Sequence, residues 1–445
     1  MRFPEKKSSL DLSLIERKIN IISLGCSKNT VDSEQLAYQL KMNDFKVVFE
    51  SKKHLPISII NTCGFIQDAK EQSIEIILDC IKAKSEGKIK VLIVFGCLYQ
   101  RYKEELATEL PEVDAFFGVH DADGIVNYLQ AEFNSDYLKN RLLSTPSHYS
   151  YLKISEGCNH RCSFCAIPNI RGKYVSKPLE QLINEAEIMA QEGVKELILI
   201  AQDLTYYGID LYKKSQLSKL LKSLLKIQEI DWIRLHYAYP STFPLDILDV
   251  MNENEKVCKY LDLPLQHIND DILHSMKRNT TEKEIRSLID TIRKKVPDAA
   301  LRTSFIVGYP GETKKIYRQL EAFINEIGFD RLGVFTYSHE EKTAAYLLKN
   351  TISKREKESR KENLMFLQQE ISLTKNTQKI GSIYKVLIDT ENKTHYIGRT
   401  EFDSPEVDNL VYVSKKAIKC DIGGFYSVKI TKAEAFDLYG EVVEI

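Results

Sequence analysis

Short apolar runs alternate with longer amphipathic stretches over the first third of the chain. The apolar runs have the length of buried strands, and the stretches between them repeat apolar residues at helical spacing. The predicted strands are 19–24, 57–60 and 89–95, and the predicted helices are 32–42 and 66–84. Strands that alternate with helices favour a parallel α/β sheet. We therefore expect an α/β domain at 18–135, preceded by a polar tail at 1–17.

A longer series of the same kind follows a linker at 136–148. The six predicted strands are 151–154, 196–200, 232–237, 260–265, 301–307 and 331–335. Six strand–helix units over 149–375 predict a (βα)6-type partial TIM barrel. In such a barrel the active site lies at the carboxyl ends of the strands.

The pattern changes again near residue 376. A charged helix is predicted at 353–379, and short β segments broken by Gly and Pro follow it. These segments are 384–389, 396–400, 410–413 and 426–433. They predict a small antiparallel β-barrel at 376–445, so the whole chain is of the α/β class with a β-rich tail.

Composition narrows the class of protein. The 445 residues include 62 basic and 63 acidic side chains, so no global field attracts nucleic acid or an anionic membrane. No apolar run approaches the roughly 18 residues of a membrane span, and the N-terminus lacks the apolar core of a signal peptide. We expect a cytoplasmic protein. In a reducing compartment, nine cysteines favour metal ligation over disulfides.

Three of these cysteines form one motif. Cys158, Cys162 and Cys165 stand in a Cys-x3-Cys-x2-Cys spacing within a polar loop, where buried structural thiols are not expected. They supply one ligand fewer than a structural zinc or a ferredoxin cluster takes. A three-cysteine iron–sulfur cluster leaves one iron open, which indicates chemistry on a bound small molecule. A zinc site completed by His160 stays an alternative, although its position between two of the cysteines strains the geometry.

A second set of cysteines is spread over the first domain. Cys26, Cys63 and Cys97 each follow a predicted strand and stand beside a glycine. Because loops after neighbouring parallel strands converge, these cysteines are candidates for a second cluster, and the glycines would let backbone approach it. Buried thiols at strand ends are the alternative. The other cysteines, Cys80, Cys258 and Cys420, lack such a context and are expected in ordinary packing.

Two cysteine triads and a β-rich tail resemble the radical S-adenosylmethionine methylthiotransferases. Within this family the chain is most similar to the RimO branch, which modifies a ribosomal protein. The matching stretches are 25–34, 61–66, 96–102, 164–172 and 398–406. After Gly172 the family often carries an Arg-Ser-Arg-like run, whereas this chain reads differently at 173–177. The resemblance covers nearly the whole chain and identifies the tail as a TRAM domain.

The resemblance implies two 4Fe-4S clusters and S-adenosyl-L-methionine as cofactors. Cys158, Cys162 and Cys165 would hold the radical-SAM cluster, and the other triad the auxiliary cluster. Phe164 would lie near the adenine. The implied reaction uses a 5′-deoxyadenosyl radical to abstract hydrogen from the β-carbon of an aspartate, and then transfers a methylthio group to that carbon.

Four further residues at or near strand ends are assigned to the cofactor by this resemblance. They are Gln202, Asp203, His267 and Arg302. Residues 308–312 form a turn that would bring backbone close to S-adenosylmethionine. Ordinary roles in turns and packing are the alternative for all four residues.

The implied substrate is the small-subunit ribosomal protein S-twelve, with an electron donor such as flavodoxin or ferredoxin. The transfer-RNA branch tends to have Ser-x-Arg after its second cysteine, where this chain has Gly64, Phe65 and Ile66. Residues 376–445 hold nine basic and eleven acidic side chains, which favours a basic protein partner and no specific nucleic-acid target. An ordinary solvated acidic loop is the alternative for the acidic segment 401–408. A transfer-RNA methylthiotransferase and a zinc- or RNA-binding adaptor without enzyme activity remain as alternative functions.

Overall fold

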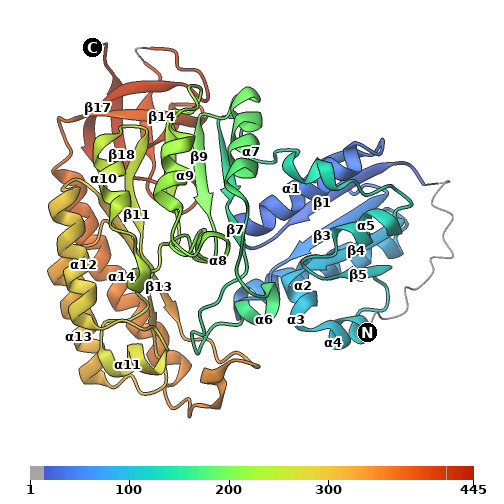
Figure 1. Cartoon of the computed structure of the whole chain (residues 1–445), viewed down its shortest axis with the longest axis horizontal. Coiled ribbons are helices and arrows are strands. Elements are labelled where there is room, and N and C mark those ends of the chain that lie inside the picture. The colour runs from blue at the N-terminus through green and yellow to red at the C-terminus, as the bar shows by residue number, and fades with distance from the viewer. Residues whose placement is uncertain (1–14, 417, 445) are drawn as a thin grey trace. The chain divides into compact units, whose positions relative to one another are not determined.

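The computed structural model describes residues 15–416 and 418–444. Most of the polar tail expected at 1–17 therefore lies outside the described residues. The chain divides into two compact units (Figure 1). The first unit extends up to Thr145 and also takes in Glu156–His160 and Cys165–Val175, while the second unit holds the rest of the chain.

The first unit is built on a five-stranded parallel sheet. Its strands are β1 (Lys18–Ser23), β2 (Lys46–Phe49), β3 (Ile57–Thr62), β4 (Val91–Gly96) and β5 (Ala115–Phe117). Its helices are α1 (Ser27–Lys41), α2 (Gln67–Ser85), α3 (Cys97–Arg101), α4 (Lys103–Glu109), α5 (Ala122–Tyr128), the 3-10 helix η2 (Ser135–Lys139) and α6 (Ile167–Arg171). Alternate residues of the central strands face opposite sides: Ile59 packs with α1 and α5, and Ile60 packs with α2. Helices on both faces explain why every residue of β3 and β4 is buried.

The strand order creates a crevice in this sheet. The order is β2-β1-β3-β4-β5, with all neighbours parallel. The chain leaves β1 toward β2 on one side and later returns to β3 on the other side, so the connections diverge between β1 and β3. Open α/β sheets bind their ligands beyond the carboxyl ends of the strands at such a point.

The second unit contains a six-stranded parallel sheet in the order β13-β12-β11-β10-β9-β6. Its strands are β6 (Tyr149–Lys153), β9 (Glu196–Ile200), β10 (Trp232–Leu235), β11 (Val257–Asp262), β12 (Ala300–Val307) and β13 (Arg331–Thr336). Its helices are α7 (Leu179–Gln191), α8 (Ile209–Tyr212), α9 (Leu217–Leu224), η3 (Pro240–Thr242), α10 (Asp246–Glu253), α11 (Asp270–Ser275), α12 (Glu282–Lys295), α13 (Lys314–Ile327), η4 (Ala344–Leu347) and α14 (Lys354–Thr377). Two short strands, β7 (Ser155–Glu156) and β8 (Val175–Ser176), flank the cysteine loop. The sheet stays open, so the predicted partial barrel is confirmed.

The C-terminal residues form a closed five-stranded barrel, as predicted (Figure 1). Its strands are β14 (Ile383–Glu391), β15 (His395–Thr400), β16 (Val411–Ser414), β17 (Phe425–Ala433) and β18 (Leu438–Val442). All pairs are antiparallel except β16 with β18, which is the pair that brings the last strand back beside an earlier one. The sequence pattern had not indicated β18, nor β2 and β5 of the first unit.

The C-terminal barrel is seated on the amino ends of the central strands. Trp232, the first residue of β10, meets the ring of Phe425 edge-on, with 4.8 Å between centroids. Lys195, directly before β9, donates to the Gly423 carbonyl at 2.7 Å. Because active sites of such barrels lie at the carboxyl ends of the strands, the C-terminal barrel contacts the end of the sheet opposite to the expected active site.

No helix within 15–416 and 418–444 is long and apolar enough to cross a membrane.

Candidate functional site

The three scattered cysteines follow strands that end in register. Ser23 of β1 is paired with Asn61 of β3, and Asn61 with Phe95 of β4. Cys26, Cys63 and Cys97 follow within a few residues of those positions. The three cysteine turns therefore lie at one edge of the sheet, beside the point where the connections diverge.

Glycines allow these turns to approach each other. Gly25 has a φ of +97°, and a Cβ placed on it would lie 2.6 Å from the Cβ and 2.8 Å from the Sγ of Cys63. A Cβ on Gly64 would lie 2.7 Å from the carbonyl oxygen of Cys97. Any larger residue at either position would push the cysteine turns apart, so the structure requires glycine at 25 and 64.

Asn29 connects two of the turns with the third. Its Nδ2 donates to the carbonyls of Leu24, at 2.7 Å, and Thr62, at 3.1 Å, and its Oδ1 lies 3.7 Å from Cys97 Sγ. The side chain is fully buried. Sequence reasoning missed Asn29 as a functional candidate, although it lies in the matching stretch 25–34.

Burial sets the acid–base state of these thiols. Cys26 is exposed, while Cys63 and Cys97 are buried. Burial raises the pKa of the Cys63 thiol, and raises that of Cys97 to about 12. Both thiols are therefore protonated at neutral pH in the free protein. A cluster held by these two thiols would have to displace their protons, because the thiolate is the ligand.

The loop that carries the other triad is closed at its neck by backbone contacts. Cys158 N donates to the Gly172 carbonyl at 3.1 Å, and Tyr174 N donates to Asn159 Oδ1 at 3.1 Å. Gly157 has a φ of +75°, and a Cβ on it would overlap the carbonyl oxygen of Lys173. The loop therefore starts and ends at one place, with Cys158 beside that neck.

Arg171 lies at the same neck. Its side chain is buried and pairs with Glu156, Asp32 and Asn29. Ile170 of helix α6 and Ala166, directly before this helix, also pack against Cys97. Arg171 was part of a matching stretch in the sequence, but nothing local indicated that it reaches the first cysteine set.

Cys162 lies in the second unit, where it has polar neighbours of its own. Arg278 Nη1 lies 3.7 Å from Cys162 Sγ, and the Arg278 guanidinium stacks over the Tyr239 ring at 4.0 Å. Arg278 Nη2 also donates to the Pro264 carbonyl at 2.6 Å, which fixes the guanidinium in place. Sequence reasoning had not singled out Arg278 either.

The two residues after Cys162 anchor the loop to the central domain. Ser163 N donates to the Met276 carbonyl at 3.0 Å, and its hydroxyl lies 2.8 Å from the Tyr309 hydroxyl. Phe164 packs in an apolar cluster with Met276, Tyr309 and Tyr337. Its predicted place beside an adenine stays a prediction.

The donor set fits an iron–sulfur cluster, since soft thiolates are the ligands such clusters take. Within residues 15–416 and 418–444, no three His, Cys, Asp or Glu side chains are gathered as ligands of one metal ion. Ligation by either cysteine triad therefore stays a prediction. Cys80, Cys258 and Cys420 each belong to an apolar core, as expected for ordinary packing.

Gln202 and Asp203 lie two and three residues beyond Ile200, the last residue of β9, so they are at the carboxyl end of this strand as the sequence predicted. Asp203 is buried, and its Oδ1 accepts from the backbone N, at 2.9 Å, and the hydroxyl, at 2.6 Å, of Thr205. The carboxylate thus shapes the turn after β9. A role for either residue in cofactor binding stays a prediction.

His267 is fully buried beside the turn at 308–312. Its Nδ1 accepts from the backbone N of Ile268 and Asn269, so a neutral ring carries its proton on Nε2. Nε2 lies 3.7 Å from Glu312 Oε1. Glu312 in turn accepts from the backbone N of Gly308 and pairs with Arg360 of α14 at 3.1 Å. These contacts hold the turn in place, and contact of His267 with a cofactor stays a prediction.

Arg302 lies near the start of β12, away from that turn. Its guanidinium pairs with Asp262 at 3.1 Å and with Asp408 of the C-terminal barrel at 3.3 Å. The charge of Arg302 is therefore used in these two ion pairs near the amino end of the strand, and contact of Arg302 with a cofactor stays a prediction.

Apart from the exposed Glu406, the acidic side chains at 401–408 do not form the free surface that their charge pattern indicated. Asp403 pairs with Arg331, Asp408 pairs with Arg302, and both carboxylates are buried. Glu401 accepts from Lys259 N at 3.1 Å. The electrostatic reason for attracting a basic partner is therefore wrong for these carboxylates, which instead fasten the C-terminal barrel to the central strands.

The departing segment at 173–177 is also held by contacts within the protein. Ser176 donates to Asp210 through its backbone N, at 2.8 Å, and its hydroxyl, at 2.6 Å. Lys177 pairs with Glu185 at 2.7 Å.

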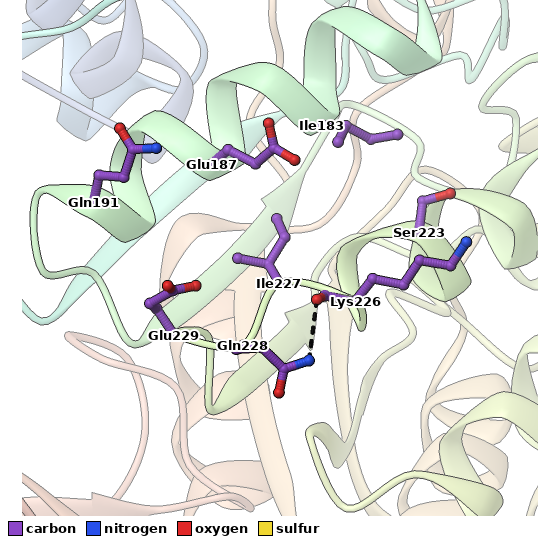
Figure 2. A pocket seen from close by; sticks show the side chains of 8 residues that line it. All are labelled: Ile183, Glu187, Gln191, Ser223, Lys226, Ile227, Gln228 and Glu229. Carbon is purple, nitrogen blue, oxygen red and sulfur yellow. Dashed lines mark hydrogen bonds between the residues drawn. The ribbon is translucent and has the colours of Figure 1, made fainter.

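A separate cavity of about 410 Å³ lies between α7 and residues 223–229 (Figure 2). It contains none of the residues that the sequence indicated for cofactor binding.

Three family models match the chain in the order of its structural parts. Residues 18–118 match the uncharacterized protein family UPF0004, residues 152–324 the radical SAM superfamily and residues 380–443 the TRAM domain. A solved radical S-adenosylmethionine methyltransferase, TsrM from Kitasatospora setae, has a similar fold, with a TM-score of 0.51 and 13% identity over 72% of each chain. The family models define a radical SAM enzyme with a TRAM domain, and the solved structure shows the fold.

Curated relatives narrow this class. The chain is 50% identical to a ribosomal protein uS12 methylthiotransferase RimO of Christiangramia forsetii, over 97% of this chain and 96% of the relative. It is 53% identical to the protein of the same description in Cytophaga hutchinsonii, over 96% and 98%. The chain belongs to the RimO family of ribosomal protein uS12 methylthiotransferases.

Proposed function

We propose that the protein attaches a methylthio group to the β-carbon of an aspartate in ribosomal protein uS12, giving 3-methylthioaspartate. The convergence of the Cys26, Cys63 and Cys97 turns at the diverging point of the first sheet carries this proposal. A single cysteine triad would serve many radical SAM reactions, whereas a second thiolate site is what a sulfur transfer needs. Membership of the RimO family supports uS12 as the substrate.

The proposed cofactors are two 4Fe-4S clusters and S-adenosyl-L-methionine. The loop triad would hold the radical-SAM cluster, and the scattered triad would hold the auxiliary cluster. When bound, the first would supply the electron that splits S-adenosylmethionine to a 5′-deoxyadenosyl radical, and the second would hold the sulfur. We assign the auxiliary site to residues 18–135, the radical chemistry to 149–375 and a TRAM domain to 376–445, with 136–148 between the first two.

The protein's own residues position these groups. Ser163 and Tyr309 tie the radical-SAM loop to the turn at 308–312, and Gly25 lets the auxiliary cysteine turns close together. Phe164, Gln202, Asp203, His267 and Arg302 are proposed for the vicinity of S-adenosylmethionine. We expect the protein to act in the cytoplasm, to take electrons from a flavodoxin or ferredoxin, and to have no specific nucleic-acid target.

The test uses the reconstituted protein with dithionite, S-adenosylmethionine and three substrates offered separately: free uS12, the assembled small subunit and transfer RNA. We expect mass spectrometry to find one methylthio group on an aspartate of uS12, and none with the triple variant C158A/C162A/C165A. Methylthiolated transfer RNA would support the transfer-RNA alternative instead. A colourless protein that contains zinc and no iron would support the adaptor alternative.

A further inference from the structure

We propose that Arg171 is a positioning residue for the auxiliary cluster. Its guanidinium holds the Asn29 carboxamide, whose Nδ2 donates to the backbone carbonyls just before Gly25 and Cys63, and so joins the auxiliary cysteine turns to the neck of the radical-SAM loop. This inference rests on the proposed function, since it takes the auxiliary cysteines as cluster ligands.

The contacts of Arg171 use both terminal nitrogens. Nη2 lies 2.6 Å from Asn29 Oδ1 and 2.9 Å from Asp32 Oδ2, while Nη1 lies 3.0 Å from each carboxylate oxygen of Glu156. Arg171 is only 3% exposed. Burying a cation this completely is costly unless it is paired, and a planar fork suits two carboxylates and one amide oxygen at once. A lysine at this position would keep the charge and lose most of these directed bonds.

Asn29 connects Arg171 to the cysteine turns through hydrogen bonds. Its Nδ2 donates to the carbonyls of Leu24 and Thr62, so the amide presents its oxygen to Arg171. Thr62 directly precedes Cys63. The orientation of one amide is thereby tied to the positions of two cysteine turns, and Arg171 holds that orientation.

Arg171 and its partner Glu156 lie on either side of the radical-SAM loop in the sequence. Glu156 stands two residues before Cys158, and Arg171 stands six residues after Cys165. The guanidinium therefore bridges the neck of one cysteine loop to the crevice of the other triad. A cation there would also offset the negative charge of a thiolate-bound cluster. Local charge and hydrogen bonding set the reduction potential of such clusters.

The experiment isolates the auxiliary site in the full chain. The parent is the triple variant C158A/C162A/C165A, which can bind only the auxiliary cluster, and R171Q and R171K are added to it. R141Q is the matched control, because Arg141 is an equally buried arginine of the first unit and pairs with Glu34 at 3.1 Å. After reconstitution, iron and sulfide per chain, the rate of iron loss to a chelator and the midpoint potential by electron paramagnetic resonance are measured.

We expect R171Q to lose iron about tenfold faster than the parent and to shift the midpoint potential to more negative values. R171K should keep a potential nearer to that of the parent, and R141Q should match the parent. N29A is also added to the parent, and the double variant N29A/R171Q should lose iron no faster than the worse of the two single variants, because the two residues act through one contact. If R171Q does not fold, the test uses R171K, which should lose iron faster than R141Q does.

Parent-like iron loss and potential in R171Q, or equal changes in R171Q and R141Q, would overturn the inference alone. A parent without any cluster would overturn both the inference and the proposed auxiliary site. Failure of the wild-type protein to methylthiolate uS12, with the R171Q potential shifted in the triple-variant background, would overturn the proposed function and leave the inference standing.

Discussion

Arg399 of β15 and Glu196 of β9 form an ion pair 2.8 Å long that is almost completely shielded from solvent. The other oxygen of Glu196 lies 2.7 Å from Arg234 Nε, and Arg399 also pairs with Asp389 at 2.6 Å. This network joins the C-terminal barrel to the amino ends of the central strands. Removing one member would leave charged partners uncompensated in the protein interior.

The first prediction concerns this network. E196Q should lower the free energy of unfolding of the second unit by about 3–5 kcal/mol, since it leaves two buried arginines short of a carboxylate. Trp232 is the single tryptophan of the chain and lies at this junction, so its fluorescence during urea denaturation reports the change. The control is E282Q, at an exposed pair with Arg286, which should cost less than about 1 kcal/mol. Equal losses of unfolding free energy in E196Q and E282Q would contradict a larger contribution of the buried network.

The second prediction is the response to acid. Burial alone would raise the pKa of Asp403, but Arg331 outweighs it and holds that pKa below its usual value; the pKa of Glu196 is likewise low because its arginine partners outweigh its burial. A carboxyl whose pKa is depressed in the folded state contributes stability above its unfolded pKa of about 4 and loses it as pH falls further. Asp408 acts in the opposite sense, because burial raises its pKa.

The thermal midpoint of the apo protein, followed by Trp232 fluorescence, should therefore fall steeply below about pH 4. D403N should have a lower midpoint at pH 7 and a smaller further drop between pH 5 and pH 3. A variant that is as acid-sensitive as the wild type would show that Asp403 does not contribute to the acid transition.

The third prediction concerns the turn after β12. Gly308 has a φ of +75°, and a Cβ on it would overlap Lys357 Cγ of α14. Gly193 has a φ of +99° with nothing within 4 Å, so it serves as a control for backbone strain alone. G308A should cost about 1–3 kcal/mol more than G193A in unfolding free energy and should weaken S-adenosylmethionine binding, measured by calorimetry. If G308A binds S-adenosylmethionine as tightly as the wild type, the turn after β12 does not contribute to the cofactor site.

The fourth prediction tests the convergence of the auxiliary cysteines. G25A should reduce the iron of the reconstituted protein from about eight atoms per chain to about four, because its Cβ would displace Cys63 and spare the loop triad. G87A is the control: Gly87 also has a positive φ, +77°, but faces only the Lys90 ammonium, at 3.8 Å. The iron content of both variants is measured after reconstitution. About eight iron atoms per chain in G25A would show that the auxiliary cluster does not depend on the close approach of Gly25 and Cys63.

Local pattern was enough for most of the architecture. The period of apolar residues predicted the buried strands β3 and β4 and the long helix α2 to within a few residues. It missed β2 and β5, which lie at the two edges of the first sheet. Edge strands are only partly buried, so they carry a weaker alternation of apolar and polar residues than central strands do.

Contacts between distant residues were beyond such reasoning. Arg171 and Asn29 are separated by 142 positions, and each residue alone reads as an ordinary member of a polar stretch. The acidic segment at 401–408 shows the reverse error, because its net charge was visible but its arginine partners on β12 and β13 were not. Net charge describes a surface only where the side chains remain on it.

The sequence by itself predicted which residues carry the chemistry and determined the order of strands and helices along most of the chain. Cysteine spacing, glycine placement and hydrophobic period are local, and each constrains the backbone within a few residues. Only the tertiary structure decided which distant side chains meet: Arg171 with Asn29 at the cysteine crevice, and Asp403 with Arg331 under the C-terminal barrel. The physical reason is that a buried charge must find its partner wherever the packing brings one, and packing depends on the whole chain.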